Sequence, residues 1–330
     1  MRRALPAAGL LVCILLALLA RLHVVATPVL AAGTTRIYVT NHLDDTVSVI
    51  DGSADAVVAT VRVGRAPAGM AVSPDRRFVY VANSGSSTVS VLDRAGNRIV
   101  STVALPRRSR PVGLAVSPDG RTLYTADGGS DRVSVIDTRT GRLVGSVRVG
   151  RQPLSVAVSP DGRRLYAANS GADDLSVINA RTRRVARVVP TGRFPSGVAV
   201  TPDGASAYVT DELSGVTVVD AVRGTVEARL AARSPFGVAI SPDGARAYVT
   251  DLGPGELTVI DTRTRKVASR VSVGPTGTDP FAAQATGHAI YVANQGANTL
   301  SVIDPDTLHV AATVPTGHSP YGIAVAQPAQ

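Results

Sequence analysis

A proline recurs along the chain, and the residue two positions before it is often arginine. In chain order, that position holds Arg65, Ser109, Arg151, Arg193, Arg233, Thr278 and His318. Arg110 lies one residue after Ser109 and would supply the basic group in that copy. A guanidinium presents a rigid fork of N–H donors that matches carboxylates and phosphates, so several of them around one opening would bind an anion. The alternative is that repeat duplication has copied a soluble polar residue.

Aromatic residues gather near the same prolines in the C-terminal half of the chain. The residue after each proline is Ala68, Val112, Leu154, Ser196, Phe236, Phe281 or Tyr321, and Phe194 stands directly before its proline. Rings beside guanidinium groups suit an anionic or planar ligand. The candidate ligand-binding residues are therefore Arg65, Arg110, Arg151, Arg193, Arg233, His318, Phe194, Phe236, Phe281 and Tyr321.

A weaker set of residues has the donor types of a metal site. It comprises His42, Asp44, Asp45, Asp279 and His318. Imidazole and carboxylate groups bind divalent metals and also act as general acids and bases, although an ordinary solvated loop explains the same residues. The sequence carries no G-x-S-x-G, H-E-x-x-H or P-loop motif. We therefore expect no cofactor, leave a divalent metal open, and name no catalytic residue.

A repeated unit carries these candidates. Tyrosine begins the same tetrapeptide at Tyr38, Tyr80, Tyr124, Tyr166, Tyr208, Tyr248 and Tyr291, with steps of 42, 44, 42, 42, 40 and 43 residues. In the third copy, the stretches 112–118, 122–127, 133–137 and 143–150 predict four strands, with turns at 117–120 and 138–141. A period of this length is typical of the blades of a propeller.

The repeat predicts an all-β protein, a seven-bladed β-propeller with four antiparallel strands in each blade. One such sheet cannot bury both of its faces, whereas seven in a ring can. Small residues recur in the first strands, which crowd around the axis, at Gly69, Gly113, Ser155, Gly197, Gly237, Ala282 and Gly322. Residues 36–41 match the second strand of a copy but have no first strand before them. Residues 320–326 match a first strand but have no second strand after them. We expect these two segments to share one blade and to close the ring.

A polar residue ends the second strand of every copy: Asn41, Asn83, Asp127, Asn169, Asp211, Asp251 and Asn294. Since every copy has one, we interpret them as structural residues that hydrogen-bond the backbone of turns. The seventh copy departs from the repeat, because it lacks the SPDG turn and has His288 in a shorter one.

The face opposite the arginine loops is also basic. We place Arg76, Arg77, Arg121, Arg163 and Arg164 in first turns, and Arg139, Arg142, Arg181, Arg183, Arg184, Arg263, Arg265 and Lys266 in third turns. Such a surface attracts polyanions. Aromatic stacking platforms are missing from these turns, which disfavours the reading of single-stranded nucleic acid.

The tetrapeptides YVTN at Tyr38 and YVAN at Tyr80 and Tyr291, with the AVSPDG and SVID segments around them, resemble the YVTN-type β-propeller repeat over residues 34–326. The resemblance implies a seven-bladed propeller of the kind found in exported and surface-layer microbial proteins. More distantly, it is similar to the propellers of sugar lactonases and of virginiamycin B lyase. Those enzymes use channel-mouth carboxylates, His or Asn with a metal, but no motif of theirs recurs here residue by residue.

The first 32 residues have the features of a signal peptide. Arg2 and Arg3 precede the apolar run 4–20, and Val29 and Ala31 suit the −3 and −1 positions of a cleavage site. An uncleaved anchor is the alternative, because the run approaches membrane-spanning length. Cleavage would leave residues 33–330 as a single propeller domain without Cys13, the only cysteine. It would also remove three arginines and lower the formal charge from +9 to +6.

Together these features favour an exported, non-catalytic binding or scaffold protein at the cell surface or in the extracellular space. Its expected partner is an anionic small molecule, a surface polymer or another protein, and we expect a monomer. One alternative is a metal-assisted, lactonase-like hydrolase or lyase that uses the arginine-lined mouth. A second alternative is a protein that binds nucleic acid or a cell-wall polymer.

The export signal leads to a direct test. If it is cleaved, the mature chain should begin near Ala32 or Gly33, because the small residues before them suit a signal peptidase. N-terminal sequencing of protein from the culture supernatant and from the cell envelope measures this. An intact Met1 in a soluble cytoplasmic fraction would contradict the prediction.

Overall fold

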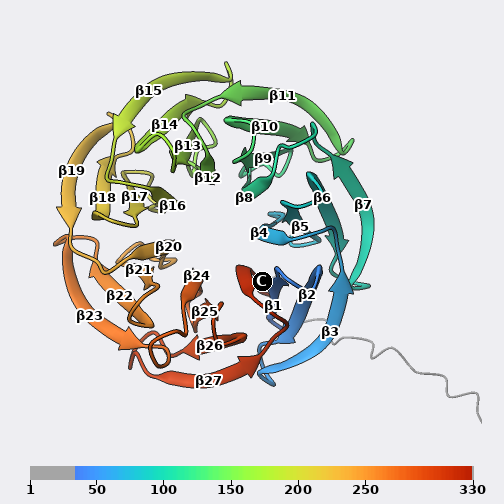
Figure 1. Ribbon diagram of the computed structural model, residues 1–330, viewed down its shortest axis with the longest axis vertical. Helices are drawn as coiled ribbons and strands as arrows, with labels where there is room; N and C mark the ends of the chain where they lie inside the picture. Colours follow the sequence, from blue (N-terminus) through green and yellow to red (C-terminus); the bar gives the residue numbers. More distant parts are fainter. Residues whose placement is uncertain (1–33, 329–330) are drawn as a thin grey trace, which may run out of the picture. The chain divides into compact units, whose positions relative to one another are not determined.

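The computed structural model describes residues 34–328, and the predicted signal peptide lies outside them. The described residues form seven four-stranded antiparallel sheets, which surround a common axis as the blades of a propeller (Figure 1). Blade 1 contains β28 (Pro320–Ala326), β1 (Arg36–Asn41), β2 (Thr46–Asp51) and β3 (Ala56–Arg62), and blades 2 to 7 follow in chain order with four strands each. The predicted all-β, seven-bladed propeller is confirmed. No helix able to cross a membrane occurs between residues 34 and 328.

Each blade runs from an inner first strand to an outer fourth strand. The first strands are β28 (Pro320–Ala326), β4 (Pro67–Val72), β8 (Pro111–Val116), β12 (Pro153–Val158), β16 (Pro195–Val200), β20 (Pro235–Ile240) and β24 (Pro280–Ala285). The second strands are β1 (Arg36–Asn41), β5 (Phe78–Asn83), β9 (Thr122–Asp127), β13 (Arg164–Asn169), β17 (Ser206–Asp211), β21 (Arg246–Asp251) and β25 (Ile290–Asn294).

The outer half of each blade consists of a third and a fourth strand. The third strands are β2 (Thr46–Asp51), β6 (Thr88–Asp93), β10 (Arg132–Asp137), β14 (Asp174–Asn179), β18 (Gly215–Asp220), β22 (Glu256–Asp261) and β26 (Thr299–Ile303). The fourth strands are β3 (Ala56–Arg62), β7 (Arg98–Ala104), β11 (Arg142–Arg148), β15 (Arg184–Pro190), β19 (Thr225–Leu230), β23 (Lys266–Ser272) and β27 (Val310–Pro315).

The structure corrects several predicted boundaries. In the third copy the first strand was expected at residues 112–118 and the fourth at 143–150, whereas β8 begins at Pro111 and β11 at Arg142. Proline is tolerated as the first residue of a strand, where its missing N–H is not needed. Arg142, Arg164, Arg184 and Lys266 begin strands rather than lie in turns. The SPDG turn lies where expected, and Gly120 in it has a φ of 72° that favours glycine.

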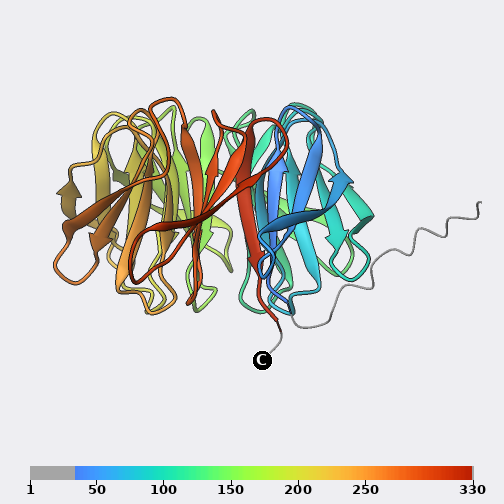
Figure 2. The ribbon, with the colours of Figure 1, turned by 90° about the horizontal axis from the view of Figure 1, so that it is seen from below.

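The hydrophobic core lies between the blades. The second and third strands are buried almost throughout, because a neighbouring blade covers each of their faces. The fourth strands are mostly exposed and bury one valine each in most blades, such as Val147 of β11. Viewed from the side, the strands run between the two faces of the ring, where the loops gather (Figure 2).

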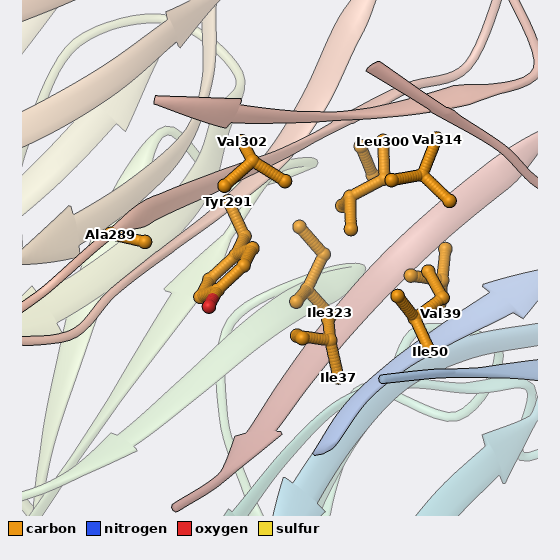
Figure 3. Close-up of a cluster of buried hydrophobic side chains, with 10 residues drawn as sticks. Ile37, Val39, Ile50, Ala289, Tyr291, Leu300, Val302, Val314 and Ile323 are labelled. Carbon is orange, nitrogen blue, oxygen red and sulfur yellow. The ribbon is translucent and has the colours of Figure 1, made fainter. Parts of the chain in front are cut away.

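The chain closes the ring by pairing β28 with β1. The two strands are antiparallel, with Arg36 opposite Ala326 and Val39 opposite Ile323. Ile37, Val39 and Ile323 then pack against Leu300 and Val314 of blade 7 in one buried cluster (Figure 3). The expected sharing of one blade between residues 36–41 and 320–326 is confirmed.

Neighbouring first strands approach each other closely at the axis. A Cβ atom on Gly69 would lie 2.5 Å from the carbonyl oxygen of Val112 in the next blade, and one on Gly113 would lie 2.8 Å from that of Leu154. Any side chain at these two positions would collide with backbone, which explains the small residues that the sequence repeats there.

Loss of the closing strand should open the ring. We expect a chain truncated before Pro320 to lose the burial of Ile323 and to leave the inner edge of β1 unpaired. A loss of about 4 kcal/mol would lower the melting temperature of a domain this size by roughly 10 °C. Thermal unfolding and light scattering measure the effect. Deleting only residues 327–330 serves as the control, and a truncated protein that stays monomeric with an unchanged melting temperature would contradict the closure.

Candidate functional site

A cavity of about 190 Å³ lies at the axis of the propeller. First-strand residues from all seven blades line it, among them Met70, Leu114, Val156, Val198 and Ile323. Its lining residues are the second to fourth residues of the first strands, so it lies toward the face that carries the loops between fourth and first strands and the loops between second and third strands. These two loop sets touch in every blade, as where the Gly85 N–H donates to the Arg65 carbonyl at 3.0 Å. We call this the arginine face and the opposite one the far face.

Three predicted aromatic residues come together where the cavity meets the arginine face. The ring centres of Phe236 and Phe281 lie 3.8 Å apart, and those of Phe281 and Tyr321 lie 4.3 Å apart. His42 continues the row, since its ring stacks on Tyr321 with 5.5 Å between centres. Phe194 lies apart from this row and is 40% exposed. The mouth therefore has a continuous aromatic wall on the side formed by blades 6, 7 and 1.

The predicted arginines lie on loops around the cavity, and in the described structure none of them lines it. Arg65 donates a hydrogen bond to the Gly85 carbonyl at 3.2 Å. Arg193 lies over the ring of Phe194, 5.5 Å from its centre, and Arg233 is 4.0 Å from the carboxylate of Glu256. Arg110 and Arg151 are exposed and have no side-chain hydrogen bond or ion pair to the described residues. The guanidinium groups thus flank the mouth rather than converge inside it.

The predicted metal-ligand candidates take part in separate contacts. His318 Nδ1 lies 2.9 Å from Asp44 Oδ1, and the hydrogen bonds from His318 lower the pKa of Asp44. Asp45 accepts the backbone N–H of Ala66 at 2.9 Å, and Asp279 lies in the loop that enters blade 7. Within residues 34–328, no three His, Cys, Asp or Glu side chains are grouped so that they could hold a metal ion.

The Asn and Asp residues that end the second strands have a structural role. The Asn83 amide donates to the hydroxyls of Thr88 and Ser90 on the third strand and accepts the Gly64 N–H at 3.2 Å. The sequence predicted bonds to turn backbone, whereas the main partners in the structure are third-strand hydroxyls. At three of these positions a carboxylate replaces the amide, and burial raises the pKa of Asp127, Asp211 and Asp251.

The residues that follow these Asn and Asp side chains form an inner ring that the sequence analysis missed. In blade order they are His42, Ser84, Gly128, Ser170, Glu212, Leu252 and Gln295. Each backbone N–H donates at 2.9–3.2 Å to the carbonyl of the residue before the repeated proline, so all seven stand beside the prolines at the mouth. If the seven copies are aligned at this position, Glu212 is the only acidic residue among the seven.

Comparisons with known proteins support the propeller. A family model described as YNCE-like beta-propeller matches residues 4–127, and no curated protein matches the chain. Hydrazine synthase of Kuenenia stuttgartiensis is 26% identical with a TM-score of 0.73, and the match covers 82% of this chain and 92% of that one.

Two further solved structures share the fold at lower identity. A functionally unknown protein from Desulfotomaculum acetoxidans is 15% identical with a TM-score of 0.75, over 90% of this chain and all of that one. The dihydro-heme d1 dehydrogenase NirN is 19% identical with a TM-score of 0.64. The match covers 85% of this chain and 63% of the NirN chain. These likenesses show the fold, and the resemblance to YVTN repeats and lactonases stays a prediction.

The buried carboxylate of Asp127 predicts a pH-dependent stability. Burial raises its pKa from 3.8 to about 6, and the hydrogen bonds from Ser134 and Thr125 offset only part of this. A raised pKa means that the folded state holds the proton more tightly than the unfolded chain. The contribution of this carboxyl group to stability is therefore fully present below about pH 4 and is lost as the pH rises through about 6. The free energy of unfolding falls by about 3 kcal/mol over this change.

Asp127→Asn should remove this loss, because asparagine occupies the same position in four other blades. We expect the variant to be more stable than the wild type above about pH 7 and no more stable below about pH 4. Denaturant unfolding across this range measures it. The reverse change, Asn83→Asp, should introduce a similar loss, and equal pH slopes in all three proteins would contradict the assignment.

Proposed function

We propose that the protein is an exported binding protein without catalytic activity, and that it takes a small anionic ligand at the channel mouth on its arginine face. The basic start and apolar run of residues 1–32 support export. The aromatic wall, the axial cavity and the surrounding arginines support a ligand site at this mouth.

One observation carries the proposal: large apolar side chains are concentrated in one arc of the mouth, formed by blades 5, 6, 7 and 1. At the position after the repeated proline, blades 2 to 4 have Ala68, Val112 and Leu154, whereas blades 6, 7 and 1 have Phe236, Phe281 and Tyr321. At the second position of the loop between second and third strands, five blades have glycine, whereas blades 1 and 5 have leucine. These two leucines, Leu43 and Leu213, are 72% and 62% exposed. Random drift of a repeat would scatter such departures, while a ligand site concentrates them.

The arginines around the mouth supply the preference for an anion. Arg151 and Arg193 precede the first strands of blades 4 and 5, and both are exposed. Exposed single ion pairs contribute about 1 kcal/mol or less, but several guanidinium groups acting on one phosphate or carboxylate contribute more. Glu256 offsets the charge of Arg233, so Arg151 and Arg193 are the better candidates for contact with an anion.

A polyanion is the second candidate ligand, and the outer rim of the propeller favours it. The seven fourth strands carry nine basic residues and only one acidic residue, Glu227. The basic residues are Arg62, Arg98, Arg142, Arg148, Arg184, Arg187, Arg229, Lys266 and Arg270. A polymer bound there would be released steeply by salt and would tolerate single substitutions.

Anion titrations test the proposed site. Phosphate, sulfate and glucuronate should each stabilise the wild type in a saturable way, as measured by thermal shift. The double variant Arg151→Ala with Arg193→Ala should lose that stabilisation, with an affinity at least about tenfold lower, because two charge-assisted contacts are gone. The matched control removes two far-face arginines, Arg163 and Arg181, and should behave as the wild type.

The outcomes separate the candidates. If no anion stabilises the wild type, or if all proteins respond equally without saturation, the small-anion site is wrong. If only a polymer such as polyphosphate binds, and both double variants bind it equally with steep salt dependence, the outer rim is the binding surface.

A further inference from the structure

Glu212 stands apart from the other members of the inner ring. It is the only acidic residue among the seven, and its side chain is half-buried. In the described structure its carboxylate has no hydrogen bond and no ion pair, although its backbone N–H donates to the Phe194 carbonyl at 3.2 Å. A carboxylate that is partly removed from water without a partner is costly. Burial accordingly raises its pKa.

The equivalent position in blade 1 indicates which elements lie next to Glu212 in the repeat. There, His42 Nδ1 lies 3.0 Å from the carbonyl of Pro67, the proline of the next blade. By the repeat, the equivalent neighbours of Glu212 are Pro235 and Phe236 of blade 6. Glu212 therefore belongs to the blade next to one end of the aromatic wall, and His42 stacks on the other end. Burial raises the pKa of the Tyr321 hydroxyl, and the negative charge of Glu212 raises it further.

An unpaired carboxylate beside aromatic rings attracts a cation. The face of an aromatic ring carries partial negative charge, and organic ammonium groups bind over such faces. A bare metal ion is less suited, because the described residues offer no group of three metal ligands. An anion at the same point would be repelled by Glu212. Phe236, Phe281 and Tyr321 line the cavity of about 190 Å³, whereas Glu212 lies outside its lining, on the loop above it. This volume is smaller than the roughly 300–1,000 Å³ typical of pockets for drug-sized ligands, which favours a compact head group.

We propose that the channel mouth binds the ammonium group of a zwitterionic small molecule, with Glu212 as its counter-ion and Phe236, Phe281 and Tyr321 as its wall. The anionic end of the same molecule then faces the arginines around the mouth, Arg151 and Arg193. This inference rests on the proposed function and makes it narrower: the ligand carries a positive charge as well as a negative one.

Three probes separate the two charges: choline has only the cation, inorganic phosphate only the anion, and phosphocholine both. Calorimetric titration of the full chain should give saturable binding of choline, and phosphocholine should bind at least tenfold more tightly than choline or phosphate. Glu212→Gln keeps the shape of the side chain and removes its charge, so it should weaken choline and phosphocholine at least tenfold. It should leave phosphate binding equal or stronger. Glu227→Gln, on the outer strand β19, is the matched control and should change none of these.

Each outcome bears on a separate claim. Phosphate binding without choline binding, and with no advantage for phosphocholine, would overturn the ammonium site and leave the proposed anion site intact. Choline binding that Glu212→Gln does not weaken would also overturn it. Choline binding that depends on Glu212, without phosphate binding, would support the ammonium site and contradict the anionic ligand. If none of the three probes binds to the wild type, both proposals are wrong.

Discussion

The close approach of neighbouring first strands at the axis is the constraint on which the rest of the structure depends. At five of the seven junctions, the carbonyl of the residue after the repeated proline lies where a Cβ of the preceding blade would otherwise fit, as between Gly69 and Val112. Hydroxyl groups fix the same junction, since Thr210 donates to the Phe236 carbonyl at 2.6 Å. This contact sets the spacing of the blades, and the spacing decides which side chains reach the mouth.

Because the axial contact is made by backbone, the side chains above it are free to differ. The inner ring keeps one hydrogen bond in all seven blades while its side chains range from Gly128 to Glu212. A site can therefore arise at one arc of the mouth without disturbing the sheets below. The same reasoning explains why Asn83 and its equivalents barely vary, since they connect the second strand, the third strand and the loop.

Most of the fold could be predicted from the sequence, because the repeat specifies the same local choices seven times. The second strand of blade 3, β9, occupies the predicted residues 122–127, and the sharing of blade 1 by β1 and β28 followed from the incomplete copies at the two ends. The site was harder to predict. The contact of Phe281 with Tyr321 depends on where adjacent blades place their loops, and the direction of the Arg65 and Arg233 side chains depends on local partners, Gly85 and Glu256. Glu212 was missed because it follows an Asp that has an equivalent in every copy.

The pairing of β28 with β1 has a consequence for the order in which the protein is made. Arg36 meets Ala326, so blade 1 receives its inner strand only after every other described strand has been synthesised. A growing chain is therefore an open array whose first blade has one vacant edge, and the closing contact joins the most distant parts of the described sequence. Contacts of such long range form slowly. The inner edge of β1 therefore stays unpaired until synthesis of the described chain is almost complete.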